Sequence, residues 1–357
     1  MLGKKIRYYR LKNGLTSDEL ANMIGCTKAS ISLYESDSRT PDGETSKKIA
    51  DALGITLAKL FNKDDQNLLF DHKSFRKKQN VSKKEIELLK SEIEQECSKR
   101  ISLLNILGDL PTKPFKAKQL SMDSGVYENA KIIRKEINIP QFGPFYEITN
   151  SLENIGIIVI SFACDENIDG LNGTVNNIPY IFFNSNIKTI ERQRSTVVHE
   201  LCHLFFNDLE DTKENEKYIT ELAANVLLPS EDIFKEFGKT NRNITIYLRD
   251  MMAKRYKIAP SLLIMRLFES GVITESYQKN FFIYLNKNGG RKAEKSFLSE
   301  IFDSEKPTLF IRQVYRALSD ELITASKAAE FLSVPLIDVM NNMRSIWWSI
   351  YIVIPVF

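Results

Sequence analysis

The sequence predicts a mainly α-helical chain that contains one α+β domain and begins with an all-α domain. Short amphipathic helical patterns, separated by turn signals, fill residues 1–63. Two apolar runs of strand character, 157–162 and 178–184, then stand between helical patterns within residues 120–270. The pattern is helical again over residues 271–357. At roughly 150 residues per domain, a chain of 357 residues has room for two or three domains.

The composition is that of an ordinary folded protein, with 49 Lys and Arg, 46 Asp and Glu, and a formal net charge of +3. A charge this small does not by itself indicate nucleic-acid binding. The cysteines lie far apart without a Cys-x-x-Cys pair, which excludes a disulfide framework and a thiolate zinc site and fits a reducing cytosol. No apolar run reaches the about 20 residues of a spanning helix, and the basic start lacks the apolar core of a signal peptide. We therefore expect a cytoplasmic protein with no membrane partner.

The N-terminal 63 residues carry the start and stop signals of successive short helices. Thr16 or Ser17 can cap one helix, Gly25 ends it, and Thr27 can cap the next. The segment LTSDELANMIGCTKASISLYES resembles the helix-turn-helix domain of Xre/Cro-type regulators. This resemblance implies double-stranded DNA as a partner.

In such a domain the second motif helix would present a set of side chains to a DNA groove, namely Thr27, Lys28, Ala29 and Ser32. Arg39 would lie near phosphates, together with Lys4, Lys5, Arg7 and Arg10. However, 11 Lys and Arg against 9 Asp and Glu over residues 1–65 is a modest balance for a DNA-binding domain. A helical bundle that binds a protein partner is the alternative.

Residues 64–119 are expected to form a charged helical linker. Leu89, Ile93 and Cys97 recur at helical spacing within a stretch that is otherwise rich in charge. His72, which belongs to this linker, is expected to be solvated.

The segment from residue 120 to residue 270 is predicted to be the mixed domain. Its two strands, Ile157–Phe162 and Ile178–Asn184, are expected to be separated by Gly-containing turns at Asp169-Gly170 and Asn172-Gly173. Pro179 suggests an edge position for the second strand, which could then pair with an extended substrate by strand addition.

The strongest functional signal is the motif His199-Glu200-Leu201-Cys202-His203. Positions i and i+4 lie on one face of a helix, so both imidazoles can reach one metal ion. A zinc ion with an open coordination position lowers the pKa of its bound water to about 7. Glu200 can then take the proton of this water as general base and pass it to a leaving amine.

Such a zinc site needs a third protein ligand. Four downstream residues are candidates on chemistry alone: Glu210, Glu214, Glu216 and Glu221. The residues themselves leave this choice open.

The segments RQRSTVVHELCH and ELAANVLLP resemble the ImmA/IrrE-type metallopeptidases, which show R-x-R-F-T-x-A-H-E-x-G-H and later E-x-E-A-N-x-F-A-A-x-L-L-x-P. Alignment on Ala223-Ala224 and Pro229 places the family's ligand glutamate on Glu216, while Glu221 followed by Asn225 makes a competing match. The chain departs from the pattern at Ser195, at Cys202 and at Ile219-Thr220, where the family has Phe, Gly and Ala-Asn. We expect Cys202 to be a small packing residue rather than a redox-sensitive one.

The resemblance covers about residues 125–270 and implies a zincin-like metallopeptidase domain. It implies His199, His203 and Glu216 as zinc ligands and Glu200 as the catalytic residue. We therefore predict a zinc-dependent peptidase and transcriptional regulator, which cleaves a regulatory protein such as a repressor and binds DNA in the same chain. We expect no membrane partner, and a homodimer is a further expectation.

The alternatives are a DNA-binding regulator whose zincin domain is a sensor, and an antitoxin-like module that binds a partner with little cleavage. The apolar tail over residues 346–357 is expected to be a buried strand or a partner surface.

Overall fold

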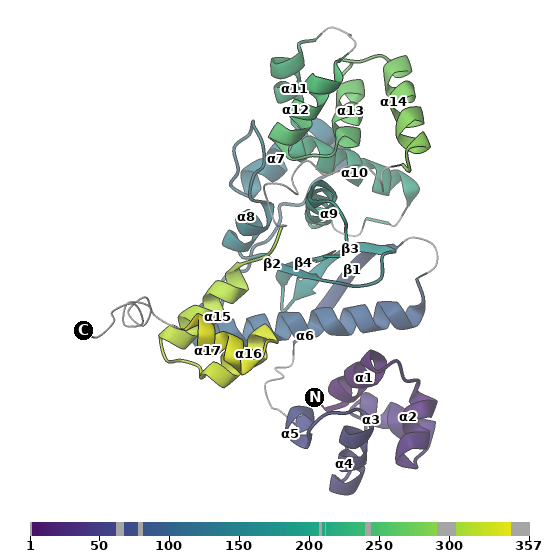
Figure 1. Cartoon of the computed structure of the whole chain (residues 1–357), viewed down its shortest axis with the longest axis vertical. Helices are drawn as coiled ribbons and strands as arrows, with labels where there is room; N and C mark the ends of the chain where they lie inside the picture. Colours follow the sequence, from purple (N-terminus) through teal and green to yellow (C-terminus); the bar gives the residue numbers. More distant parts are fainter. Residues whose placement is uncertain are drawn as a thin grey trace, which may run out of the picture. The chain divides into compact units, whose positions relative to one another are not determined.

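A computed structural model describes residues 2–61, 68–77, 81–206, 209–210, 212–239, 244–290 and 305–343. For residues 74–77 it describes the backbone only. The chain divides into two compact units. The first comprises Met1–Glu94 and Lys113–Pro307, and the second comprises Gln95–Thr112 and Thr308–Phe357. The predicted fold class is confirmed, because helices dominate and a single four-stranded sheet accompanies them (Figure 1).

The N-terminal bundle consists of α1 (Leu2–Lys12), α2 (Ser17–Ile24), α3 (Lys28–Glu35), α4 (Gly43–Ala52) and α5 (Leu57–Phe61). Thr16 caps α2 in a capping box with Glu19, and Thr27 caps α3 by accepting from the Ser30 amide. Gly25 ends α2 in the left-handed conformation, at φ 72°. The predicted sequence of caps and turns is therefore present in this bundle.

The sheet contains β1 (Phe70–Lys77), β2 (Ile158–Phe162), β3 (Ile168–Val175) and β4 (Ile178–Asn184), in the order β1-β3-β4-β2. β2 and β4 are parallel, whereas β3 is antiparallel to both of its neighbours. Asn176 and Asn177, both at positive φ, form the tight turn between β3 and β4.

Three of the strand predictions are wrong. The Asp169-Gly170 and Asn172-Gly173 pairs lie inside β3 rather than in turns. β4 is a central strand, and Pro179 is tolerated there because the pairing of β4 with β2 begins one residue later, at Tyr180. The linker contributes the strand β1, which pairs with β3.

The remaining helices of the first unit pack against the sheet or against one another. They are the first part of α6 (Lys83–Leu107), then α7 (Val126–Glu136), α8 (Ile148–Asn154), α9 (Ile190–His203), α10 (Lys213–Leu227), α11 (Ser230–Phe237), α12 (Ile246–Tyr256), α13 (Pro260–Glu269) and α14 (Glu275–Lys287). α9 lies over β3 and β4 and packs against α10 (Figure 1). Its apolar side chains, such as Val197 and Leu201, belong to the large core of this unit.

The second unit contains the end of α6 with α15 (Leu309–Ser319), α16 (Ala325–Leu332) and α17 (Leu336–Asn342). Leu103 of α6 is buried against Phe310 and Val314 of α15. This agrees with the helical pattern expected near the C-terminus, while the apolar tail over 346–357 lies outside the described residues. Within the described part of the chain, no helix combines the length and the apolar character that crossing a membrane requires.

Candidate metal centre

The HExxH motif lies in the last turns of α9. Because one helical turn separates His199 from His203, the two rings lie on one face, and their Nε2 atoms are 3.2 Å apart. Both side chains are buried, at 2% and 9% exposure. The helix therefore presents two imidazole nitrogens to one point.

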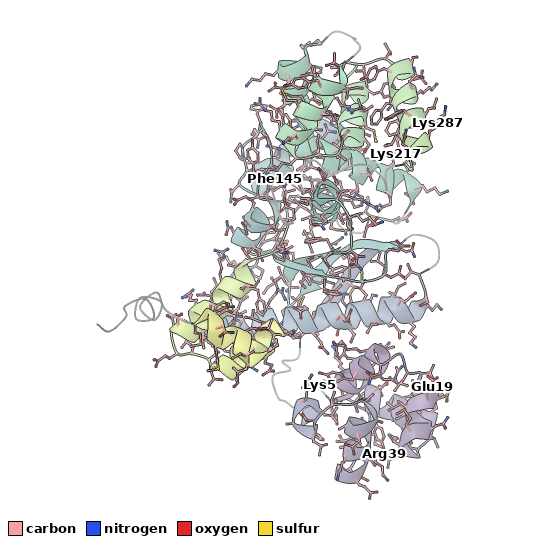
Figure 2. The ribbon with its side chains drawn as sticks, in the orientation of Figure 1. Lys5, Glu19, Arg39, Phe145, Lys217 and Lys287 are labelled. Carbon is pink, nitrogen blue, oxygen red and sulfur yellow. The ribbon has the colours of Figure 1, made fainter. Side chains whose placement is uncertain are left out.

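Glu216 completes the group from the first turn of α10. Its Oε2 lies 3.3 Å from Nε2 of His199, and its Oε1 lies 3.2 Å from Nε2 of His203. Thr212 caps α10 by accepting from the Asn215 amide, which fixes the start of the helix that carries the carboxylate. Figure 2 shows Lys217, the residue after Glu216, on the same helix.

The three donor atoms fit a zinc ion in kind and in spacing. Two nitrogens and one carboxylate oxygen are a donor set that zinc takes up in catalytic sites. Bond lengths near 2.0–2.1 Å in a tetrahedron put neighbouring donor atoms about 3.3 Å apart, and the observed separations are 3.2 Å and 3.3 Å. Among the described residues, these three form the one group of His, Cys, Asp or Glu that could hold a metal ion.

The charge state of Glu216 suits a ligand. Burial alone would raise the pKa of its carboxyl group, but the hydrogen bonds and charges of His199 and His203 hold that pKa well below its ordinary value. Glu221 lies further along α10, and its backbone carbonyl accepts from the Asn225 side chain. The geometry thus brings Glu216, and not the competing Glu221, to the two histidines.

Glu200 is buried on the side of α9 that faces β3. Its Oε2 accepts a hydrogen bond of 2.8 Å from Nδ2 of Asn172, and its Oε1 is buried without a hydrogen-bond partner in the described part of the chain. Gly170 makes room for this carboxylate, because a Cβ atom there would lie 2.8 Å from Cγ2 of Thr196 and 3.1 Å from Oε1 of Glu200. A buried acceptor without a donor is what a proton-accepting group beside a metal ion requires.

Asn172 and Gly170 were not predicted as site residues. In the sequence they read as turn residues, and their nearness to Glu200 arises only when β3 packs on α9. A glycine inside a strand can indicate a close approach by another group, and this is the signal that could have found Gly170.

Two arginines at the start of the motif hold α9 in place. Arg192 donates from Nη2 to both carboxylate oxygens of Asp169 in β3, each at 2.9 Å. Arg194 is buried and donates to the backbone carbonyls of Lys257 and Tyr146 at 2.9 Å, and it also binds Glu305 and the carbonyl of Phe145. Phe145 lies in the loop between α7 and α8 (Figure 2). These contacts join the motif helix to the strand on one side and to loops on the other.

Cys202 lies between the two histidine-bearing positions and is fully buried in the main core. Burial raises the pKa of its thiol, which disfavours the reactive thiolate. This agrees with the expected packing role.

The side chains that were predicted to face DNA are all exposed on the N-terminal bundle: Thr27, Lys28, Ala29, Ser32 and Arg39. Nζ of Lys28 lies 2.7 Å from Oδ2 of Asp18, and Arg39, labelled in Figure 2, stacks 5.9 Å from the Tyr34 ring centre. Their contacts with DNA remain predictions.

Two other sequence expectations are wrong. Arg10 is buried and pairs with Glu35, with Nη2 donating to Oε2 at 2.9 Å, so it is not available to phosphates. His72 is not simply solvated, because its Nδ1 lies 2.5 Å from the Tyr180 hydroxyl and its Nε2 lies 3.1 Å from Oε1 of Glu94.

Known protein families match two parts of the chain. Residues 6–60 match the family described as helix-turn-helix, and residues 153–268 match the IrrE N-terminal-like domain family. A curated relative, the cryptic phage CTXphi transcriptional repressor RstR of Vibrio cholerae, is 34% identical over 68 residues. That match takes in 19% of this chain and 61% of the length of the repressor.

Solved structures give alignments that are too weak to describe the fold. Apo ComR from S. thermophilus aligns over 96% of this chain and 94% of its own, with 15% identity and a TM-score of 0.17. PlcR from Bacillus thuringiensis, in complex with the peptide PapR7 and DNA, aligns over 96% of both chains with 13% identity and a TM-score of 0.17. The family matches and the described elements together identify a helix-turn-helix domain at the N-terminus and, further along the same chain, an IrrE-like domain that carries the His199, His203 and Glu216 cluster.

Proposed function

We propose that this protein is a zinc-dependent peptidase that cleaves a regulatory protein and binds double-stranded DNA through its N-terminal domain. The observation that carries the proposal is the convergence of His199, His203 and Glu216 beside the buried carboxylate of Glu200. Three protein ligands and a fourth, open position are the arrangement of catalytic rather than structural zinc sites.

Each residue of the centre has a distinct role in this proposal. His199, His203 and Glu216 would hold the ion, which when bound supplies a Lewis acid and acidifies water. Glu200 accepts a proton at Oε1, to which no donor among the described residues binds. The Asn172 amide holds the other oxygen of the carboxylate at 2.8 Å, so that Oε1 is the atom left for proton transfer. Glu200 then returns the proton to the leaving amine.

The DNA-binding part of the proposal depends on the exposed side chains of α3 and on the loop that carries Arg39. A helix-turn-helix domain places the start of its second motif helix in the major groove, and dimers read two half-sites. We therefore propose a homodimer on a site of roughly two-fold symmetry, acting in the cytoplasm.

The second candidate is a regulator whose IrrE-like domain senses a ligand or binds a partner, in the manner of an antitoxin, with little cleavage. Burial favours it, because His199 and Glu200 expose only 2% and 1% of their surface. A domain of this kind would need the metal ligands but not the proton acceptor.

The experiment that separates the two candidates is the substitution Glu200→Gln, which keeps the size and a polar contact but removes the basic carboxylate. General acid–base assistance typically contributes about 10²–10⁴ in rate. Cells that express the wild type or the variant are compared by proteomics for loss of a target protein, with transcripts of regulated genes followed alongside. Glu214→Gln, an exposed carboxylate at the start of α10, is the matched control.

We expect Glu200→Gln to retain its zinc and its DNA binding and to lose cleavage, while Glu214→Gln behaves as the wild type. If the wild type and Glu200→Gln deplete the same proteins and give the same transcripts, the peptidase proposal is wrong and the sensor candidate replaces it.

A further inference from the structure

The strand that contacts Glu200 also has an outer edge, and this edge bears on how a protein substrate would bind. β3 approaches the carboxylate through Gly170 and donates to it through Asn172. One edge of β3 is paired with β4, along Gly170–Val175 and Ile178–Phe183. The other edge belongs to the same strand that contacts Glu200, and a strand edge can pair with an extended chain.

In this structure the chain's own segment β1 fills that edge. β1 runs antiparallel to β3, with partners from Phe70 opposite Val175 to Lys77 opposite Ile168. Leu69 continues the pairing, since its amide donates to Oδ1 of Asn176 and its carbonyl accepts from the Asn176 amide, both at 2.9 Å. The backbone groups that an extended substrate would use are therefore paired already.

The pairing of β1 with β3 is less regular than the other pairings of the sheet. Its pairing with β3 shifts register between His72 and Phe75 and again between Phe75 and Lys77. These shifts fall opposite the part of β3 that contains Gly170 and Asn172. None of the described β1 side chains is buried, whereas all seven residues of β4 are buried.

Among the described β1 side chains, the Phe70 ring stacks on His72, with 5.9 Å between the ring centres, and His72 also makes polar contacts. His72 bridges the Tyr180 hydroxyl and the Glu94 carboxylate, at 2.5 Å and 3.1 Å. Strands that bury little apolar surface open at a lower free energy than strands at the core of a sheet. Release of β1 would leave β2, β3 and β4 paired among themselves.

We propose that the outer edge of β3 is a binding site for an extended peptide beside the metal centre, and that residues 70–77 occupy it in cis. A protein substrate binds only after β1 leaves, and it then pairs with β3 in the antiparallel direction that β1 now has. The statement about peptide binding stands without the proposed peptidase function, whereas the statement about cleavage rests on it.

A reversible disulfide tests the proposal in the full-length, zinc-loaded chain. Asp71→Cys and Thr174→Cys place two thiols at directly opposed positions of an antiparallel pair, where Cα atoms lie about 4.5–5.5 Å apart and a disulfide can form. Cys26 and Cys164, which are partly exposed, are replaced by Ser in this background. The two variants that carry only one of the new cysteines, treated with the same oxidant, are the matched controls.

The probe is a fluorescein-labelled synthetic peptide with the sequence of residues 70–77, and its binding is followed by anisotropy. A second variant replaces residues 70–77 by an eight-residue Gly-Ser segment, which keeps the chain length. Because a tethered segment competes at an effective concentration in the millimolar range, we expect the peptide to bind the replaced chain at least about tenfold more tightly than the oxidised disulfide form. Reduction should return the disulfide form to the affinity of its reduced, untreated state.

Cleavage of a random decapeptide mixture, read as new amino termini, is measured on the same samples. We expect the oxidised form to be inactive and the reduced and replaced forms to be active. Equal peptide affinity of the oxidised and reduced disulfide forms would overturn the proposal, even if the replaced chain does not fold. If peptide affinity follows the release of β1 but no form cleaves, the binding site stands and the peptidase function fails.

Discussion

Glu216 and Glu221 lie on the same helix but differ in what their carboxylates can reach. Glu216 touches both imidazoles, so its removal takes away one of three ligands. We expect Glu216→Ala, like His199→Ala and His203→Ala, to abolish stoichiometric zinc binding, and Glu221→Ala to keep about one zinc per chain. Elemental analysis of the purified variants measures this. Equal zinc in Glu216→Ala and Glu221→Ala would contradict the assignment of the third ligand.

Asn172 is the polar partner of Glu200, and its removal should affect cleavage without affecting the metal. Asn172→Leu introduces a side chain of similar volume but leaves the buried Glu200 carboxylate without its hydrogen-bond donor. A hydrogen bond to a charged group contributes about 1.5–3 kcal/mol, which corresponds to a loss of roughly 10- to 150-fold in kcat/KM. Asn186→Leu, an amide in the loop between β4 and α9, is the control. Unchanged cleavage by Asn172→Leu would show that the hydrogen bond from Asn172 is not needed to orient the Glu200 carboxylate.

Individual site residues were predictable where their chemistry is local in sequence. His199, Glu200 and His203 follow from a four-residue spacing, and the resemblance chose Glu216 from among the acids downstream. Asn172 was missed because 28 residues separate it from Glu200. No short sequence pattern indicates that Asn172 and Glu200 form a hydrogen bond.

At the scale of elements, the placement of α9 depends on the buried side chain of Arg194. Burial lowers the pKa of its guanidinium, and the group is retained because it binds Glu305 and three backbone carbonyls. Removing one partner of a buried ion pair costs about 3–5 kcal/mol. We therefore expect Arg194→Met to lower the free energy of unfolding by that amount in urea titrations.

Arg192→Met is the matched control two residues earlier. Arg192 pairs with Asp169 but is 36% exposed in its side chain, and a pair that solvent reaches contributes about 1 kcal/mol or less. Equal destabilisation by the two variants would contradict the anchoring role of Arg194.

Among the elements, the helices were predicted well and the strands poorly. Caps and turn glycines such as Thr16 and Gly25 are local signals, and the helices they delimit are present. β3 was missed because its glycines imitate turns, although Gly170 and Gly173 are there to admit neighbouring atoms. β1 was missed because a polar sequence becomes a strand only when it meets β3, about 100 residues later.

At the scale of the whole molecule, the net charge of +3 is too small to provide affinity for DNA, so that affinity must come from Lys and Arg side chains near the binding surface. Each phosphate contact contributes about −0.9 to the slope of log K against log salt. We expect the full chain to bind its DNA site with a steep slope, and Lys28→Ala with Arg39→Ala to make that slope shallower by about 2. The measurement is a salt titration of binding to a site selected from random duplexes.

Lys135→Ala, at the exposed end of α7, is the control for loss of one positive charge. It should leave the slope unchanged. If the double variant keeps the slope of the wild type, the N-terminal bundle does not contact phosphates through these residues, and the protein-binding alternative for this bundle is favoured.

The order of the parts was predictable from the sequence, because each part has its own motif. Residues 6–60 and 153–268 fall within the segments that were predicted to be the helix-turn-helix and zincin-like domains. The boundaries at 63, 119 and 270 remain predictions. The division of α6 between two compact units could not be predicted from its charge-rich sequence. The end of this helix belongs to the second unit because it packs with helices more than 200 residues later in the chain.

The position of β1 in the chain also sets a length. With Leu69 bound to Asn176, eight residues lead from Phe61, the end of the DNA-binding bundle, to the sheet, and a fully extended chain of that length spans at most about 28 Å. With β1 released, 22 residues lead from Phe61 to Lys83 at the start of α6, and the limit rises to about 77 Å. If β1 leaves β3 as we propose, a DNA complex that holds the bundle beyond the shorter limit requires an open β3 edge, and the length of this tether would couple the DNA geometry to access to the metal centre.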